Sequence, residues 1–116
     1  MKIVNEIEPT VQPLPQGNDD LSKALRLETI LKNRFLGVNV EDGITNIGSI
    51  EKLLEDLDKG SNVVTKLEDK YINLNDDSTA EKLSDLNANL TAMWNCLHDL
   101  REVFEEKKEL RNRLKL

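Results

Sequence analysis

The last third of the chain carries the feature that most restricts how this protein can fold. Residues 78–116 contain neither proline nor glycine, so nothing in them interrupts a helix. Apolar side chains recur there at alternating spacings of three and four residues: Leu83, Leu86, Leu90, Met93, Leu97, Leu100 and Phe104. This heptad pattern predicts one helix of about 36 residues, roughly 54 Å long, that buries a narrow apolar stripe. Such a helix is not stable alone in water, so it needs helical partners.

A second stripe with the same rhythm precedes the first. Its members are Ile50, Leu53, Leu57, Gly60, Val64, Leu67, Tyr71 and Leu74. The polar residues 75–78 separate the two stripes, and so short a link between long helices predicts an antiparallel hairpin. In the link, Ser78 followed by Glu81 three residues later matches a capping box at the start of the last helix.

Gly60 is unusual because it falls on an apolar position of the second stripe. A glycine inside a helix costs about 1 kcal/mol relative to alanine, so its presence needs a reason. We expect a gap that receives a large side chain of the facing helix, either Met93 or Trp94. The alternative is a kink at Gly60.

The N-terminal part of the chain has a different composition. All three prolines lie within residues 1–18, which predicts an extended or disordered arm, free or laid along a helix. A shorter helix follows at about 21–36, and Gly37 is expected to end it in a left-handed conformation. Four of its side chains are basic and one is acidic, which indicates either a solvated face or contact with an acidic surface of this chain.

The fold class predicted from these patterns is all-α. We expect a long antiparallel, coiled-coil-like helical hairpin, a shorter N-terminal helix and the extended arm. The helices are predicted at about residues 21–36, 44–74 and 79–115, within a single helical domain that spans residues 19–116.

Catalytic chemistry is not expected from this sequence. The single histidine, His98, and the single cysteine, Cys96, are two residues apart, so they face different directions on a helix and cannot act as a pair. We expect no metal or cofactor site, a surface contact from His98 to Glu102, and a small, at least half-buried side chain at Cys96. Ser78 lies in an acidic context and is a possible phosphorylation site, although a plain N-cap is the simpler interpretation.

Charge and cysteine content indicate the kind of partner. The chain has 22 acidic and 16 basic residues, a net charge of −6, and this argues against direct binding of nucleic acid. Its lone cysteine, the absence of a secretory pattern in its first residues and the lack of a long apolar run predict an intracellular protein, cytoplasmic or nuclear, with no membrane span. Residues 41–106 hold 16 acids and six bases, whereas the end of the chain is basic.

The heptad pattern fails after Phe104, because the next stripe positions are Lys107 and Arg111. Apolar residues move to a different face, and Trp94 stands at the edge of the seam. The candidate partner-binding residues are therefore Trp94, Val103, Lys107, Leu110, Arg111 and Leu114.

The function predicted from these features is that of a non-catalytic subunit. It would contribute helices to a larger complex with other helical proteins, as a hetero-oligomer of scaffold, kinetochore, cytoskeletal or tethering type, by analogy of architecture alone. One alternative is a self-sufficient three-helix adaptor that binds a partner helix near Trp94. Another is a homo-oligomeric coiled coil.

Overall fold

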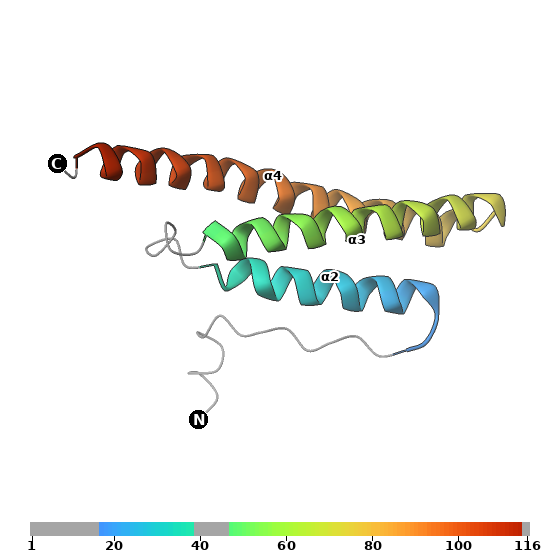
Figure 1. Ribbon diagram of the computed structural model, residues 1–116. Coiled ribbons are helices and arrows are strands. Elements are labelled where there is room, and N and C mark those ends of the chain that lie inside the picture. Colours follow the sequence, from blue (N-terminus) through green and yellow to red (C-terminus); the bar gives the residue numbers. More distant parts are fainter. Residues whose placement is uncertain (1–16, 39–46, 115–116) are drawn as a thin grey trace, which may run out of the picture.

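A computed structural model describes residues 17–38 and 47–114. Within these ranges the protein is all-α, with helices α2 (Asp20–Leu36), α3 (Ile47–Asn73) and α4 (Asp77–Leu114). Helices α3 and α4 form the predicted antiparallel hairpin, and α2 lies against it with its first residues near the hairpin turn (Figure 1). The helix α2 therefore runs parallel to α4 and antiparallel to α3.

The helix boundaries are close to the predicted ones. Helix α2 begins at Asp20, one residue early, and α4 begins at Asp77, two residues early. Helix α3 ends at Asn73. The predicted start of the second helix at residue 44, the end of the third at 115, and residues 1–16 of the predicted arm lie outside the described residues.

The two predicted stripes build most of the core. The apolar core residues of the hairpin are Ile47, Ile50, Leu53, Leu54, Leu57, Val64, Leu83, Leu86, Leu90, Met93, Leu97 and Phe104. Leu67, Tyr71 and Leu100 are partly buried against them. The prediction is wrong at Leu74, which is 62% exposed. Leu74 follows the last residue of α3 and belongs to the turn, so it has left the buried face of the helix.

The hairpin turn combines a C-cap and an N-cap in adjacent residues. Asn75 adopts the left-handed conformation, with φ of 58°. Its amide donates to the Ile72 carbonyl (3.0 Å), and the Asp76 amide donates to the Tyr71 carbonyl (2.9 Å), which is the Schellman pattern. The Asp76 carboxylate then caps α4 by accepting from the amide (3.1 Å) and hydroxyl (2.8 Å) of Thr79.

The predicted capping box at Ser78 and Glu81 is therefore wrong. Asp76 lies two residues earlier, and its two carboxylate oxygens receive both Thr79 donors at once. These two hydrogen bonds hold the pKa of Asp76 below its usual range. Ser78 consequently lies inside the first turn of α4 and is exposed.

The two ends of α2 are capped differently. At its start, Asp19 is the N-cap and accepts from the Ser22 amide (3.2 Å) and hydroxyl (2.6 Å). Gly37 is not left-handed, because its φ and ψ are −84° and −2°. Its amide donates to the carbonyls of Asn33 and Arg34, both at 3.1 Å, so the chain leaves α2 as a right-handed turn.

Gly60 is packed against α2, which corrects the prediction for its neighbour. A Cβ atom at Gly60 would lie 3.2 Å from Cδ1 of Leu31 and 3.4 Å from Cδ2 of Leu27. The expected gap exists, and the three atoms nearest to it belong to Leu27 and Leu31 of α2, not to Met93 or Trp94 of α4. The pairing of α3 with α4 does not account for this contact, because the contact depends on where α2 lies.

Candidate functional site

Helix α2 covers one of the two grooves that run along the α3–α4 hairpin. Leu31 of α2 is buried against the hairpin, with 2% of its surface exposed. Asn89 of α4 donates from Nδ2 to Oε2 of Glu28 in α2 at 3.0 Å. The last residue of α2, Leu36, lines a cavity together with Ala92 and Met93 of α4. Helix α4 continues for more than 20 residues after Met93, so its C-terminal half extends past α2.

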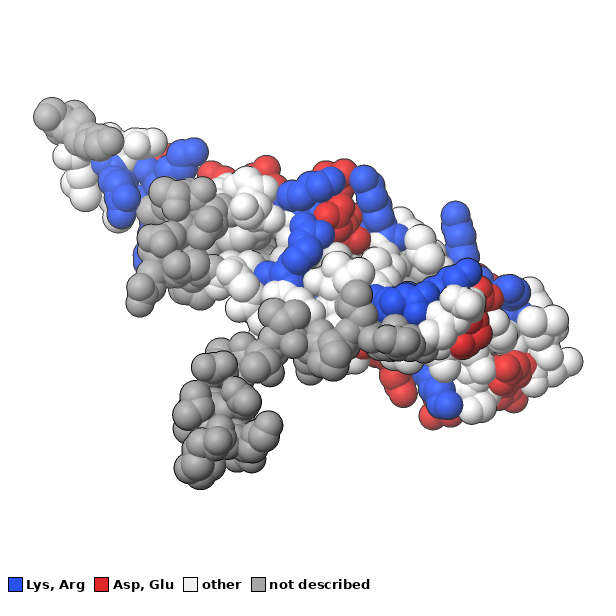
Figure 2. Space-filling model, turned by 90° about the horizontal axis from the view of Figure 1, so that it is seen from below, with Lys and Arg blue, Asp and Glu red and all other residues white. Residues whose placement is uncertain are grey.

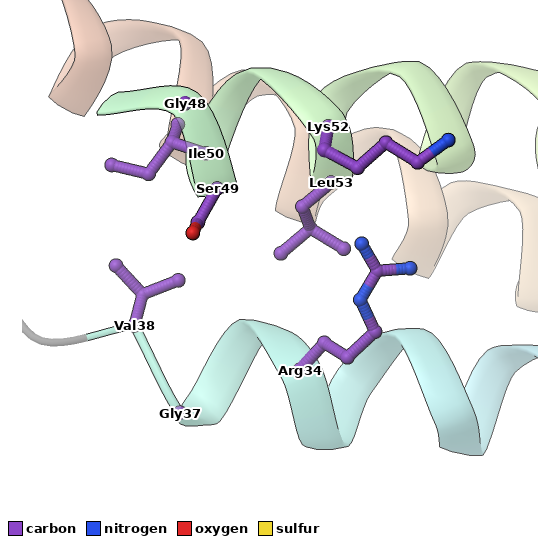
Figure 3. Close-up of a pocket in the computed structure, with 8 residues that line it drawn as sticks. All are labelled: Arg34, Gly37, Val38, Gly48, Ser49, Ile50, Lys52 and Leu53. Carbon is purple, nitrogen blue, oxygen red and sulfur yellow. The ribbon is translucent and has the colours of Figure 1, made fainter. Parts of the chain in front are cut away.

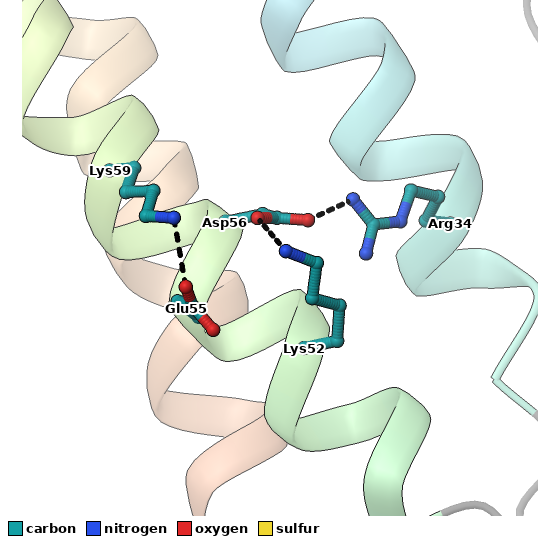
Figure 4. Close-up of polar contacts among 5 residues, drawn as sticks. All are labelled: Arg34, Lys52, Glu55, Asp56 and Lys59. Carbon is teal, nitrogen blue, oxygen red and sulfur yellow. Dashed lines mark hydrogen bonds and ion pairs between the residues drawn. The ribbon is translucent and has the colours of Figure 1, made fainter.

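The C-terminal end of α2 is held to α3 by an ion-pair network (Figure 4). Arg34 Nη1 lies 2.7 Å from Asp56 Oδ2, and Lys52 Nζ lies 3.4 Å from Asp56 Oδ1. The hydrogen bond from Arg34 is the main reason that the pKa of Asp56 lies below its usual range. Arg34 thus contacts an acidic residue of its own chain, whereas Lys23 and Lys32 are exposed.

A second cluster anchors the other end of α2. Asp20 Oδ2 accepts from Lys70 Nζ at 2.7 Å and from the Tyr71 hydroxyl at 2.9 Å. These bonds lower the pKa of Asp20 and raise the pKa values of Lys70 and Tyr71. The two clusters fix α2 at both ends and leave its position on the hairpin well defined.

A cavity of about 580 Å³ opens between the end of α2 and the first turns of α3 (Figure 3). Its lining residues are Arg34, Gly37, Val38, Gly48, Ser49, Ile50, Lys52 and Leu53. Both cations of this lining already pair with Asp56. Among the described residues, this lining contains no carboxylate, histidine or cysteine, so these residues offer no general base and no typical metal ligand.

Among the described residues, the second groove of the hairpin is lined by α3 and α4. We call it the Trp94 groove, and its lining residues are Leu57, Asp58, Ser61, Leu90, Thr91, Trp94 and Asn95. Trp94 is half-buried against the core and stacks on His98, with ring centroids 4.9 Å apart and an interplanar angle of 15°. Nearby, Ser61 Oγ donates to Asn87 Oδ1 at 2.6 Å. The groove thus joins an aromatic surface to polar groups, as partner-binding surfaces often do.

The end of α4 has no covering helix within the described residues (Figure 1). Phe104 is the last buried residue, and residues 105–114, which we call the overhang, are all exposed. Val103, Leu110 and Leu114 are 46%, 51% and 74% exposed. Lys107 and Arg111 are also exposed, and basic side chains mark this end of the molecule (Figure 2).

The predicted partner-binding residues do not form one continuous surface. Trp94 and Val103 are nine residues apart, or two and a half helical turns, so they point to opposite sides of α4. Val103, Leu110 and Leu114 share the side on which α2 packs, beyond the end of α2. Trp94 faces the groove that α2 leaves open. The structure therefore divides the candidates into Trp94, in its groove, and the residues of α4 from Val103 onward.

The remaining candidate residues offer little chemistry. Cys96 is exposed, which contradicts the predicted burial, because its position lies beyond the reach of the short helix α2. His98 Nε2 lies 3.8 Å from Glu102 Oε1, a surface contact of the expected kind. Ser78 remains accessible at the start of α4, and its modification stays a prediction.

The described residues contain neither a cluster of metal ligands nor a helix suited to cross a membrane. Within residues 17–38 and 47–114, no group of three or more potential ligands could hold a metal ion. None of the described helices combines the length and the apolar content that crossing a membrane requires. Comparison of the chain with protein-family models, curated proteins and solved structures finds no match.

Proposed function

We propose that this protein is a non-catalytic structural subunit that contributes its helical hairpin to a larger intracellular assembly of helical proteins. The observation that supports this most is the continuation of α4 beyond its own core. Ten helical residues follow Phe104, and all ten are exposed. An extension that leaves its leucines exposed to water is better explained by a partner that packs against it.

The Trp94 groove supports the same proposal. Tryptophan is enriched among the residues that dominate binding energy at interfaces, and Trp94 is only half-buried here. A further helix laid in this groove would complete a four-helix arrangement around the hairpin. The acidic middle of the chain and the basic overhang would favour partners of complementary charge. A partner that uses both surfaces would have to contact two sides of α4.

The proposal is tested by purifying the tagged full chain from its native source. We expect helical proteins in fixed stoichiometry, with recovery reduced about tenfold by Trp94→Ala or by Leu110→Glu. Ile72→Glu is the matched control, because Ile72 is 50% exposed at the turn end of the hairpin. Equal recovery of partners by the original chain and its three variants would contradict the proposal. So would the absence of any partner in fixed stoichiometry.

A self-sufficient adaptor is the second candidate, and the packing of α2 favours it. Its two polar clusters and the contact at Gly60 give the three helices one shared core. An adaptor would need only the Trp94 groove for a partner helix. In that case the isolated chain melts cooperatively as a monomer, and Leu110→Glu leaves partner recovery unchanged while Trp94→Ala abolishes it.

A further inference from the structure

Three exposed apolar residues and one lysine form a regular stripe at the end of α4. Val103, Lys107, Leu110 and Leu114 follow one another at spacings of four, three and four, and we call them the outer stripe. This rhythm is that of a coiled-coil seam. All four side chains are exposed, so the seam has no partner within the described residues.

The outer stripe is complementary to itself when two copies run antiparallel. A twofold axis midway between Lys108 and Glu109 places Val103 opposite Leu114 of the second copy. The same axis places Lys107 opposite Leu110 of the second copy, so the ammonium group meets an apolar residue over which its stem can lie. A parallel pair would instead place Lys107 against Lys107 and would be repulsive. The antiparallel arrangement also points the two hairpins away from each other.

The charges beside the outer stripe fit the same register. Glu106 and Arg113 each precede a stripe position by one residue, so they lie on one edge of it. In an antiparallel pair, residues on this edge face each other, which brings Glu106 of each copy to Arg113 of the other. Two opposite-charge contacts therefore form, related by the twofold axis.

Glu106 forms no such contact with another residue that the structure describes. Its neighbours on the same helical face are Glu102, Val103, Glu109 and Leu110, which include two acids and no base. Neither Glu106 nor Arg113 forms an ion pair with another of the described residues. The pairing with a second copy would thus place a cation next to an otherwise repelled carboxylate.

We propose that the overhang binds a second copy of this chain, in an antiparallel pair that joins two hairpins end to end. This inference rests on the proposed role as a structural subunit and adds the partner of one surface. The overlap of residues 103–114 is about 18 Å long and carries three apolar side chains per copy. So small a contact falls below the 1,200 Å² or so of a stable interface, so the pair should be weak on its own.

The test is sedimentation equilibrium of the full chain between about 10 µM and 1 mM, a range that covers weak association. We expect a reversible monomer–dimer equilibrium. Glu106→Arg and Arg113→Glu should each weaken the dimer about tenfold, because each places like charges opposite one another. The double variant E106R/R113E restores both contacts and should return the dissociation constant to within about twofold of the original.

The two single variants control for net charge. Glu106→Arg makes the acidic chain less negative, whereas Arg113→Glu makes it more negative, so a general charge effect would move the two dissociation constants in opposite directions. Glu105→Arg, which lies on the outer face of the overhang, should change nothing. Circular dichroism should show the same helicity for all variants.

Three outcomes would overturn the proposal. They are a chain that stays monomeric throughout, a dimer in which the single charge changes have opposite effects, and a double variant that remains weak. A monomer that still loses its co-purified proteins on Trp94→Ala would overturn the second-copy partner and leave the structural-subunit role standing. A chain that dimerises as described but co-purifies with no other protein would support the second-copy partner and overturn the structural-subunit role.

Discussion

The two parts of α4, before and after residue 105, form one continuous helix but differ in burial. Between Leu83 and Phe104 the helix buries six apolar residues against α3 and α2, and from residue 105 onward it buries none. Both parts lack proline and glycine and are rich in helix-forming residues. Local propensity therefore explains why α4 is continuous, and it does not explain where α4 is packed.

What separates the two parts is the register of their apolar residues. Up to Phe104 the stripe stays on the face that meets α3, and beyond it the apolar residues shift to the side where α2 has already ended. A helix that is packed along half its length needs no new nucleus to extend, so the overhang can continue from the packed part. Residues of α4 up to Phe104 therefore stabilise the fold, and the residues after Phe104 are available to bind a partner.

The largest expected effect compares one substitution on each side of this boundary. Leu97→Ala should lower the free energy of unfolding by about 2–5 kcal/mol, because Leu97 is fully buried in the seam. Leu110→Ala should change it by less than about 0.5 kcal/mol, since its side chain is 51% exposed. Denaturant unfolding of the dilute chain measures both. Similar losses for the two variants would erase the distinction.

A second comparison tests how far the packed region includes α2. Gly60→Leu should lower the free energy of unfolding by about 1–3 kcal/mol, because the new side chain meets Leu27 and Leu31. Gly48→Leu is the control, since nothing lies within 4 Å of a Cβ atom there. Denaturant unfolding again gives the values. A stabilised Gly60 variant would mean that helix propensity dominates and that α2 does not press on this site.

The turn at the far end of the packed part should give a smaller effect. Asp76→Ala removes the N-cap of α4 and should lower the melting temperature by a few degrees. Ser78→Ala should leave the melting temperature unchanged, and Ser78→Asp should preserve helicity, because a negative charge near the start of a helix is favourable. Thermal unfolding followed by circular dichroism compares the three. A larger loss at Ser78 than at Asp76 would restore the capping box.

The smallest expected effect is a dependence of stability on pH. The pKa of Asp20 is lowered by its hydrogen bonds from Lys70 and Tyr71. Its contribution is therefore complete above the ordinary value of 3.8 and is lost as the pH falls through the lower folded value. The pKa of Lys70 is raised, so that contribution is lost as the pH rises through its folded value, above 10.5.

Melting temperatures at acidic, neutral and alkaline pH measure this dependence. Asp20→Asn should reduce the change at both ends, because it removes the common partner of Lys70 and Tyr71. An unchanged profile in the Asp20 variant would show that this cluster does not hold α2.

The sequence was sufficient to predict the α3–α4 hairpin, but it was insufficient to predict where α2 packs on that hairpin. Apolar spacing and the short link determine that α3 and α4 pair, because both depend only on residues near one another in the chain. The neighbour of Gly60 could not be derived this way, since Leu27 and Leu31 reach it only through tertiary packing. The N-cap prediction failed because Asp76, two residues before Ser78, accepts both Thr79 donors, so α4 begins before Ser78.

The candidate binding residues show the same limit. The failure of the heptad at Lys107 and Arg111 is visible in the sequence, and the overhang could be predicted from it. The half-turn offset that places Trp94 and Val103 on opposite sides of α4 is also visible. Which of the two sides α2 occupies is decided by its contacts with Asp56, Gly60 and Tyr71, and these lie 22 to 51 residues along the chain from their partners in α2.

Hydrogen exchange along α4 in the dilute chain is the most direct test of the central claim. Amides of residues 83–104 should exchange slowly, and those of residues 106–114 should exchange faster by several orders of magnitude. Addition of a binding partner, or concentration of the chain itself, should slow exchange in the second group alone. Equal protection along the whole helix in the dilute chain would contradict the division of α4 at Phe104.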